Sequence, residues 1–322
     1  MESENIVHLP VMVREVLEAL KPSSPDGSGD FLIDCTLGEG GHSERFLRDY
    51  SQIRVLGLDR DASIQAKAKR RLSSFGDRVN FYLGWYNDFF CPYPLEERPT
   101  RILFDLGISV FHYVESQRGF SFRLDEPLDM RLNPDEGESA CDVVNTYSEK
   151  ALADLIFGYG EERYSRRIAR GIVQRRSSQR VLTTKDLAEI IFTSVPVSYQ
   201  HGRLHPATRT FQALRIHVNR ELERIQQAVE QAFQILAPDG VLGIISFHSL
   251  EDRIVKNLFR DWTKACICPS HQPMCNCGGK PLGTMVQRKP LVPTEEEVRQ
   301  NPPSRSAKFR TIHKLRDKRD EP

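Results

Sequence analysis

FLIDCTLGEGG, residues 31–41 of this 322-residue chain, is the clearest structural signal in the sequence. Its apolar half reads as a short buried strand, and its glycines predict a tight turn directly after that strand. SERFLRDY, residues 43–50, then has the spacing of a helix. A strand, a turn and a helix in immediate succession are typical of a parallel sheet whose strands are joined by crossover helices.

The same alternation continues on both sides of a central interruption. We expect helices at 62–76, ended by Gly76, at 218–237, and at 249–262, where Ser249 and Asp252 can cap the first turn. The expected further strands are RVLGLDRD (54–61), VNFYLG (79–84), RILFDLGIS (101–109), VLGIISF (241–247) and SAKFRTIHKL (306–315). The turn Pro238-Asp239-Gly240 precedes the strand at 241–247.

The interruption covers residues 111–215, where no apolar strand run is found and several stretches have helical spacing. One of them, at 183–195, begins with a Thr183-x-x-Asp186 cap and is stopped by Pro196. We therefore predict a Rossmann-like α/β core made of residues 1–110 and 216–322, with an inserted, mainly helical domain at 111–215.

Composition places the chain among ordinary globular proteins, since 39% of its residues are hydrophobic and 28% are charged. No apolar run is long enough to span a membrane, and the start MESENIVHLP lacks signal-peptide features, so we expect a cytosolic protein without a membrane partner. The net charge is only +1, so a nucleic-acid partner would need local basic clusters. Two exist: seven arginines against two glutamates at 161–180, and seven Lys or Arg against one aspartate at 304–319.

Seven cysteines without a secretory signal argue against a disulfide framework. Four of them form a C-x-C-x6-C-x-C pattern around His271: Cys266, Cys268, Cys275 and Cys277. The group could wrap a zinc ion, but it lacks the usual C-x2-C knuckle spacing. A reduced loop without metal is the favoured interpretation, and a zinc site is the alternative.

Polar residues stand where the predicted parallel strands end, which is where such sheets bind ligands. They are Asp34, Gly38, Gly40, Gly41, His42, Asp59, Tyr86, Asp105 and His248. The glycine turn lets backbone amides approach a ligand closely. Asp59 lies 18 residues beyond Gly41 and can accept hydrogen bonds from both hydroxyls of a ribose. The pattern predicts a nucleoside cofactor.

Two nucleoside cofactors compete for this site. A dinucleotide would suit the turn only if Ser43 replaced the last glycine of its fingerprint. S-adenosylmethionine carries a sulfonium and an amino-acid group in place of the pyrophosphate, and the carboxylates of Asp34, Asp59 and Asp105 suit these cations. The residues favour S-adenosylmethionine and leave a nucleotide-dependent dehydrogenase as the last alternative.

Longer motifs between about Leu37 and Lys314 point to one particular family, and they occur in the same order as in that family. The chain resembles the ribosomal small-subunit methyltransferase H family in eight segments: TLGEGGHS, LGLDRD, DLGIS, RGFSFRLDEPLDMRLNP, YGEERYSRRIARGIV, HPATRTFQALRIHVNREL, LAPDGVLGIISFHSLEDRIVK and NPPSRSAKFRTIHK. The resemblance implies a bacterial cytosolic enzyme that uses S-adenosylmethionine to methylate N4 of a cytidine in the decoding region of 16S ribosomal RNA, within a small ribosomal subunit.

The resemblance also implies roles for individual residues. By position, the family's cofactor-contacting residues correspond to Gly40, Gly41, His42, Asp59, Tyr86 and Asp105. His112 stands where family members usually have a glutamine, and a histidine can still make one such hydrogen bond.

A cytosine amine is a poor nucleophile, so an acceptor for its hydrogens should assist methyl transfer. Asp105 is our candidate catalytic residue for that task. Arg123, Arg209 and His248 are candidates for substrate binding, with a helix-entry role as the alternative for His248 and an ion pair as the alternative for Arg209 and Arg215. Phe120 and Phe122 could stack on RNA bases or form the core of the insertion.

Two further functions stay open at this point. The methyl group could go to another substrate, such as a DNA cytosine or a protein side chain. Alternatively, the chain could be a non-catalytic RNA-binding assembly protein that holds the cofactor as a structural ligand.

Overall fold

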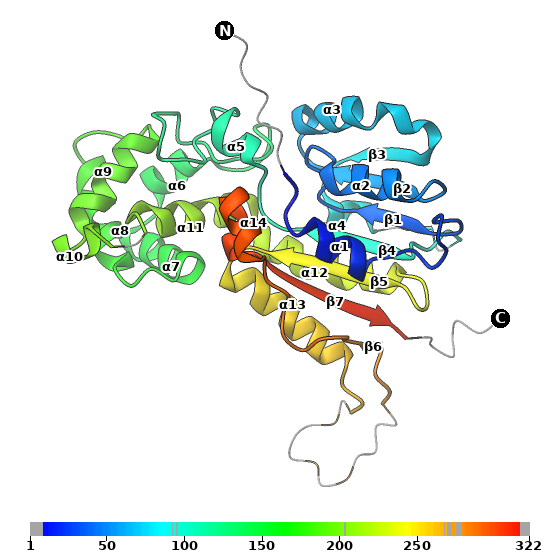
Figure 1. Ribbon diagram of the computed structural model, residues 1–322. Coiled ribbons are helices and arrows are strands. Elements are labelled where there is room, and N and C mark those ends of the chain that lie inside the picture. The colour runs from blue at the N-terminus through cyan, green and yellow to red at the C-terminus, as the bar shows by residue number, and fades with distance from the viewer. Residues whose placement is uncertain are drawn as a thin grey trace. The chain divides into compact units, whose positions relative to one another are not determined.

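The chain forms two compact units in a computed structural model that describes residues 9–91, 93, 94, 96–202, 204–266, 268, 272, 274 and 279–315 (Figure 1). One unit consists of Met1–Gly107 and Glu223–Pro322, and the other of Ile108–Leu222. The first contains a sheet and the second is helical. Among the described helices, none is both long and apolar enough to cross a bilayer.

The sheet has seven strands in the order β3-β2-β1-β4-β5-β7-β6. The strands are β1 (Phe31–Asp34), β2 (Arg54–Asp59), β3 (Val79–Leu83), β4 (Arg101–Asp105), β5 (Val241–Ser246), β6 (Gly283–Thr284) and β7 (Lys308–Lys314). Strands β1 to β5 are parallel, whereas β7 runs antiparallel to β5 and β6 antiparallel to β7. The predicted Rossmann-like α/β core is confirmed.

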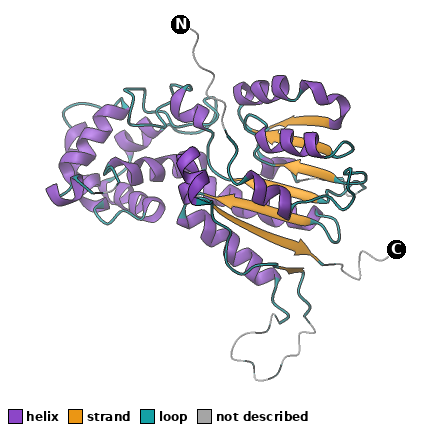
Figure 2. Ribbon diagram, in the orientation of Figure 1, coloured by secondary structure: helices purple, strands orange, loops and turns teal. Residues whose placement is uncertain are grey.

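Helices cover the sheet because the central strands are apolar on both faces, as the fully buried β5 shows (Figure 2). One cluster joins side chains of β1, β4, β5 and β7 to three helices that pack on them. These helices are α1 (Val13–Ala19), α2 (Gly41–Asp49) and α3 (Ala62–Arg71). The other elements of this unit are η1 (Ser73–Arg78), α4 (Tyr86–Phe89), α12 (Glu221–Ile235, which begins in the helical unit), α13 (Ser249–Trp262), α14 (Glu295–Gln300) and η2 (Pro302–Ser306).

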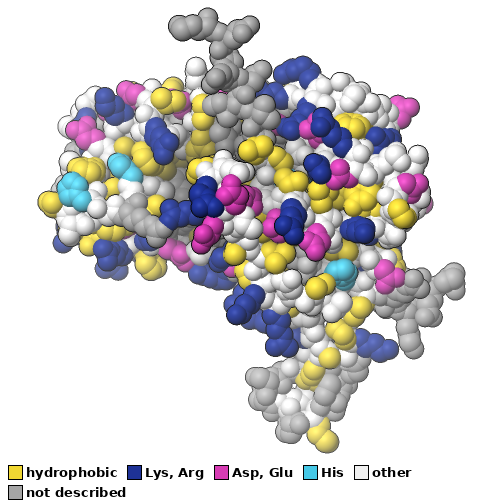
Figure 3. All heavy atoms as spheres, viewed as in Figure 1, with side chains coloured by type: hydrophobic (Ala, Val, Ile, Leu, Met, Phe, Trp, Pro, Cys, Tyr) yellow, Lys and Arg dark blue, Asp and Glu magenta, His cyan; other side chains and the backbone are white. Residues whose placement is uncertain are grey.

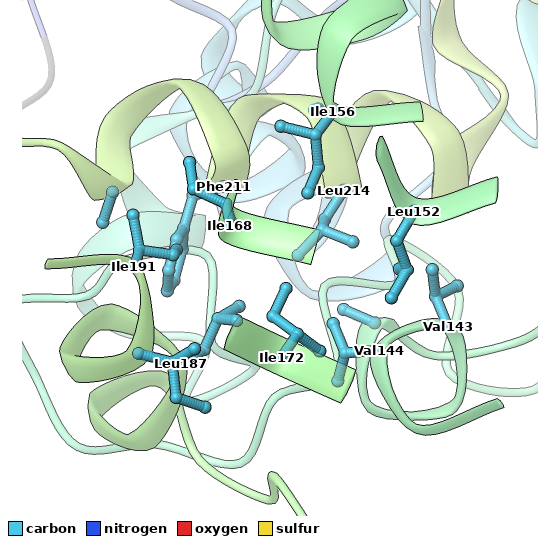
Figure 4. Packing of buried hydrophobic residues seen from close by; sticks show 14 of the residues in the cluster. Val143, Val144, Leu152, Ile156, Ile168, Ile172, Leu187, Ile191, Phe211 and Leu214 are labelled. Carbon is cyan, nitrogen blue, oxygen red and sulfur yellow. The ribbon is translucent and has the colours of Figure 1, made fainter. Parts of the chain in front are cut away.

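The helical unit has its own apolar core, to which Leu152, Ile168, Leu187 and Leu214 contribute fully buried side chains (Figure 4). Phe120 belongs to this core and Phe122 packs against it, so the core interpretation holds for Phe120. The helices are α5 (Val110–Val114), α6 (Ala140–Thr146), α7 (Glu149–Gly160), α8 (Ser165–Arg176), α9 (Thr184–Ser194), α10 (Val197–Gln200) and α11 (Ala207–Asn219). The predicted helical insertion is confirmed, while its limits of 111 and 215 as domain boundaries stay predictions.

Two predicted helices differ in the structure: one is divided in two, and the other ends early. The single helix expected at 218–237 is wrong, because Arg220 adopts φ 50° and separates the end of α11 from α12. The helix expected at 62–76 ends at Arg71, and Gly76 lies inside the following 3₁₀ segment. The positive φ of Arg220 interrupts a pattern whose hydrophobic spacing continues, so periodicity alone could not locate that break. The helix α3 ends before Leu72, whose φ is −94°, and Gly76 has its positive φ only later, in the 3₁₀ segment.

Leu187→Ala tests the independent core of the helical unit. Because Leu187 is fully buried, the truncation should lower the free energy of unfolding of this unit by about 2–5 kcal/mol. Leu182→Ala is the matched control, since that side chain is 52% exposed and its loss should cost no more than about 0.5 kcal/mol. Hydrogen exchange of the α8 amides measures the change in stability of both variants. Equal exchange in the two variants would contradict the described packing.

Candidate functional site

Three carboxylates terminate adjacent parallel strands at one edge of the sheet. Asp34 ends β1, Asp59 ends β2 and Asp105 ends β4. The registers pair Asp34 with Gly57 on one side and with Leu103 on the other, so the ends of the three strands lie close together. The parallel arrangement therefore gathers at one edge residues that the sequence separates by up to 71 positions.

Asp59 holds the glycine turn to the second strand. Its Oδ2 accepts a hydrogen bond from the Gly38 amide at 2.8 Å, and its Oδ1 accepts one from the Asp61 amide at 2.9 Å. Burial nevertheless raises the pKa of Asp59 to about 7, because desolvation of the charged form outweighs these bonds. A ligand that donates hydrogen bonds to this carboxylate would favour its ionised form.

The glycine turn requires glycine where it meets the helix α2. Gly40 has φ 79°, and a Cβ there would lie 3.0 Å from Leu72 Cδ1. Behind the turn, Asp34 accepts a hydrogen bond from Ser43 Oγ at 2.7 Å, and burial raises the pKa of Asp34. Asp34 thus joins the end of β1 to the first turn of α2, which fixes the backbone that a cofactor would approach.

His42 and Asp105 form a buried polar pair beside this turn. His42 Nε2 lies 3.6 Å from Asp105 Oδ2, with side chains that are 6% and 18% exposed. Among the described residues, both ring nitrogens of His42 and Oδ1 of Asp105 are buried without a hydrogen-bond partner. Buried polar atoms normally have partners, so this group has the donor and acceptor capacity that a polar ligand would satisfy.

Aromatic side chains after β3 lie at the same edge. The Tyr86 ring packs edge-on against Phe104 of β4, with ring centroids 5.6 Å apart. The neighbouring Trp85 ring is covered by the Arg224 guanidinium, 4.1 Å from its centroid. His112 belongs to the helical unit, where it is buried and its ring lies 5.4 Å from that of Phe120. Cofactor contact by Tyr86 and His112 stays a prediction.

His248 is the N-cap of α13, which corrects the expected caps Ser249 and Asp252. His248 and Glu251 form a capping box, with Nε2 of the histidine 3.0 Å from Oε1 of the fully buried glutamate. Asp252 instead binds Arg310 Nε at 2.7 Å and Lys308 Nζ at 3.1 Å, and although burial opposes it, these bonds lower its pKa. The sequence His-Ser-Leu-Glu at 248–251 has the spacing of a capping box, but a histidine is an unusual N-cap.

The candidate substrate-binding arginines differ in their surroundings. Arg123 is exposed, and Arg209 donates a hydrogen bond to the Glu161 carbonyl at 3.1 Å. Arg215 pairs with Glu221 through two bonds of 2.9 and 3.0 Å, so the ion-pair alternative holds for it. Contact of Arg123, Arg209 or His248 with a substrate stays a prediction.

The cysteine group reaches beyond the part of the chain that the structure describes. Cys266 is exposed and Cys268 is half-buried, whereas His271, Cys275 and Cys277 lie outside the described residues. The alternative of a zinc site stays a prediction.

The basic cluster at 304–319 is partly structural. Lys308 and Arg310 bind Asp252, and Lys314 Nζ donates to the carbonyls of Gln234 and Leu236 at 2.8 Å each. Residues after Leu315 lie outside the described part. On the face drawn in Figure 3, Lys and Arg side chains are interspersed with Asp and Glu side chains, as the small net charge predicts.

The parallel sheet, the glycine turn and the acidic strand ends define an S-adenosylmethionine-dependent methyltransferase. The carboxylates suit the cationic groups of that cofactor. Contact of Gly40, Gly41, His42, Asp59 and Asp105 with the cofactor stays a prediction. Residues 5–315 match the MraW methylase family, and the chain belongs to that family.

Curated relatives cover nearly the whole chain. The chain is 54% identical to the ribosomal RNA small subunit methyltransferase H of Treponema denticola, with 96% of this chain and 98% of that protein aligned. The protein of the same name from Treponema pallidum is 42% identical, over 96% and 93%. A putative methyltransferase from Streptococcus mutans, solved in complex with SAH, aligns over 94% of this chain and 95% of its own at 11% identity and a TM-score of 0.41.

Cofactor affinity should depend on the ionisation of Asp59. Folding raises this pKa from 3.8 to about 7, so the contribution of Asp59 to stability is present at low pH and is lost as pH rises through 7. Ribose hydroxyls favour the ionised form, so the affinity for S-adenosylhomocysteine should fall about tenfold per pH unit below 7.

Titration calorimetry between pH 5.5 and 8.5 measures this dependence. Asp59→Asn should bind more weakly and lose this pH dependence, whereas Asp77→Asn, which removes an exposed carboxylate, should retain it. A pH dependence that survives in Asp59→Asn would show that another group is responsible.

Proposed function

We propose that this chain transfers a methyl group from S-adenosylmethionine to N4 of a cytidine in the decoding region of 16S ribosomal RNA, within a small ribosomal subunit in the cytoplasm. The observation that carries the chemistry is the partly buried Asp105 carboxylate, whose buried Oδ1 has no hydrogen-bond partner in the part of the chain that the structure describes. The relatives that are named ribosomal RNA small subunit methyltransferase H, 54% and 42% identical, support the substrate.

The residues at the strand ends would hold and orient the cofactor. The backbone of Gly38–Gly41 would lie against the cofactor, and the Asp59 carboxylate would accept hydrogen bonds from the ribose hydroxyls. When bound, S-adenosylmethionine supplies an electrophilic methyl group for an in-line displacement. The main task of the protein is then to hold the attacking amine in line with that group.

Asp105 is placed to assist the amine itself. A cytosine amine shares its lone pair with the ring, and an acceptor for one N–H localises the pair and disperses the positive charge that develops. The Thr36 hydroxyl accepts the Asp105 amide at 2.6 Å and thereby holds the end of β4 in place. The carboxylate is then fixed before the substrate arrives, so little reorganisation is needed.

The proton that leaves the amine also needs an acceptor. Asp105 Oδ1 is the first candidate, and His42 Nε2, 3.6 Å from the other carboxylate oxygen, can share the proton within the pair. Neither ring nitrogen of His42 has a hydrogen-bond partner among the described residues, so the ring can accept a proton without breaking a hydrogen bond to them.

RNA bases are usually recognised when they are unstacked, with the backbone held by Lys and Arg. The helical unit supplies Arg123 and Arg209 as exposed or partly exposed cationic side chains for this purpose, and His248 lies after β5 in the sheet unit. The helical unit therefore serves as the RNA-recognition domain in this proposal.

Asp105→Asn tests the catalytic assignment. The substitution keeps the size of the side chain but removes the charge, so kcat should fall at least about a hundredfold. The measurement is transfer of a labelled methyl group from S-adenosylmethionine to small subunits that lack the modification, followed by nucleoside analysis for N4-methylcytidine. Asp77→Asn, an exposed substitution of the same kind, should retain wild-type activity.

The same assay separates the alternatives. Label in N4-methylcytidine with wild type and its loss in Asp105→Asn support both the reaction and the site. Label in DNA or protein instead would identify another substrate, and tight cofactor binding without any transfer would favour the assembly-protein alternative.

A further inference from the structure

A groove runs between α8 and α9 in the helical unit, and arginines line one side of it. Arg167, Arg170, Gln174 and Arg175 contribute from α8, and Thr193 and Ser194 from α9. The opposite face of α8 is apolar, with Ile168, Ala169 and Ile172 buried in the core of the unit. The groove is therefore formed by the polar face of a helix that is anchored by its apolar face.

Gly171 brings the two helices close at the floor of the groove. A Cβ at this position would lie 2.1 Å from Ser194 Oγ, so a larger residue would require the serine side chain to move. The long side chains of Arg167, Arg170 and Arg175 can then line the groove above a floor formed by small residues.

The arginines of the 161–180 cluster do not share one role. Arg176 donates to the carbonyls of Val144 and Tyr147 at 2.7 and 2.6 Å, so it stabilises the end of α6. Arg170 meets Glu149 only at 3.6 Å, in a pair whose side chains are 67% and 45% exposed. Such exposed pairs contribute little, so they can be exchanged for a stronger anion.

The groove offers cationic donors and no acidic side chain among the described residues that line it. The hydroxyls of Thr193 and Ser194 donate to carbonyls of their own helix, at 2.9 Å to Glu189 and 2.6 Å to Ile190. The guanidinium groups are thus the main donors toward a ligand, and their forked geometry matches phosphate oxygens.

We propose that this groove binds consecutive backbone phosphates of the RNA substrate, an inference that rests on the proposed function. Arg167 and Arg175 are eight residues apart, which at a rise of about 1.5 Å per residue gives about 12 Å along α8. That span exceeds one phosphate group and suits a polyanion. Just before α8, the Arg163 guanidinium lies 4.9 Å from the ring centroids of both Tyr164 and Tyr199, and aromatic and guanidinium planes are surfaces on which RNA bases stack.

The test compares Arg167→Gln/Arg170→Gln with the matched control Lys150→Gln/Lys185→Gln. The control removes two exposed cations from the same unit, on α7 and α9, outside the groove. The probe is a labelled single-stranded RNA fragment of the decoding region, and its affinity is measured by fluorescence anisotropy from 50 to 200 mM KCl. Affinity for S-adenosylhomocysteine and the melting temperature are measured in parallel.

The groove variant should bind the fragment about tenfold more weakly at 150 mM KCl. Its salt slope should fall by about 1.4, because each phosphate contact on a single strand contributes about 0.7. S-adenosylhomocysteine affinity and the melting temperature should remain those of wild type. Arg167→Lys/Arg170→Lys should recover most of the affinity, because the positive charges return.

Two results separate this proposal from the proposed function. If wild type methylates N4 of the cytidine and the groove variant binds and methylates as well as wild type, or the control loses equal affinity, the groove proposal is wrong. If RNA binding depends on the groove but wild type leaves the cytidine unmethylated, the proposed function is wrong and the phosphate site stands.

Discussion

The parallel pairing of β1 with β2 and β4 determines where the acidic residues of the candidate site lie. Because parallel strands end at the same edge, this pairing brings the carboxylates of Asp34, Asp59 and Asp105 together with the glycine turn. Burying the charged carboxylates at this edge is unfavourable, since burial raises the pKa of Asp34 and brings that of Asp59 to about 7. Hydrogen bonds from Ser43 and from the Gly38 and Asp61 amides offset part of that cost and fix the backbone of the glycine turn.

The three acidic residues at this edge differ in the hydrogen bonds that their carboxylate oxygens accept from the protein. Asp34 is occupied by Ser43, and both oxygens of Asp59 accept backbone amides. Asp105 retains a buried oxygen that has no partner within the described ranges, and His42 lies beside it. A carboxylate oxygen that no described residue satisfies is suited to accept a hydrogen bond from a donor that arrives with a ligand.

The basic residues divide in the same way. In the 161–180 cluster, Arg176 stabilises the end of α6, whereas Arg167 and Arg170 line a groove. In the 304–319 cluster, Lys308 and Arg310 bind Asp252, and Lys314 binds carbonyls that precede β5. Exposed cationic side chains therefore gather at a few positions although the net charge is only +1. Such positions suit the binding of a nucleic acid.

The sequence by itself determined the alternation of strands and helices, the helical character of the insertion and the identity of the residues at the strand ends, because periodicity and glycine turns act over a few neighbouring positions. The same local rules missed the break at Arg220, whose positive φ leaves no trace in the hydrophobic pattern, and favoured Ser249 over His248 as the cap of α13. Only the tertiary structure decided that His42 lies beside Asp105, that Phe120 belongs to the core and that Arg176 and Arg215 are occupied by protein partners. Which partner a polar side chain meets depends on residues far away along the chain, and that information arises only when the helices and strands pack.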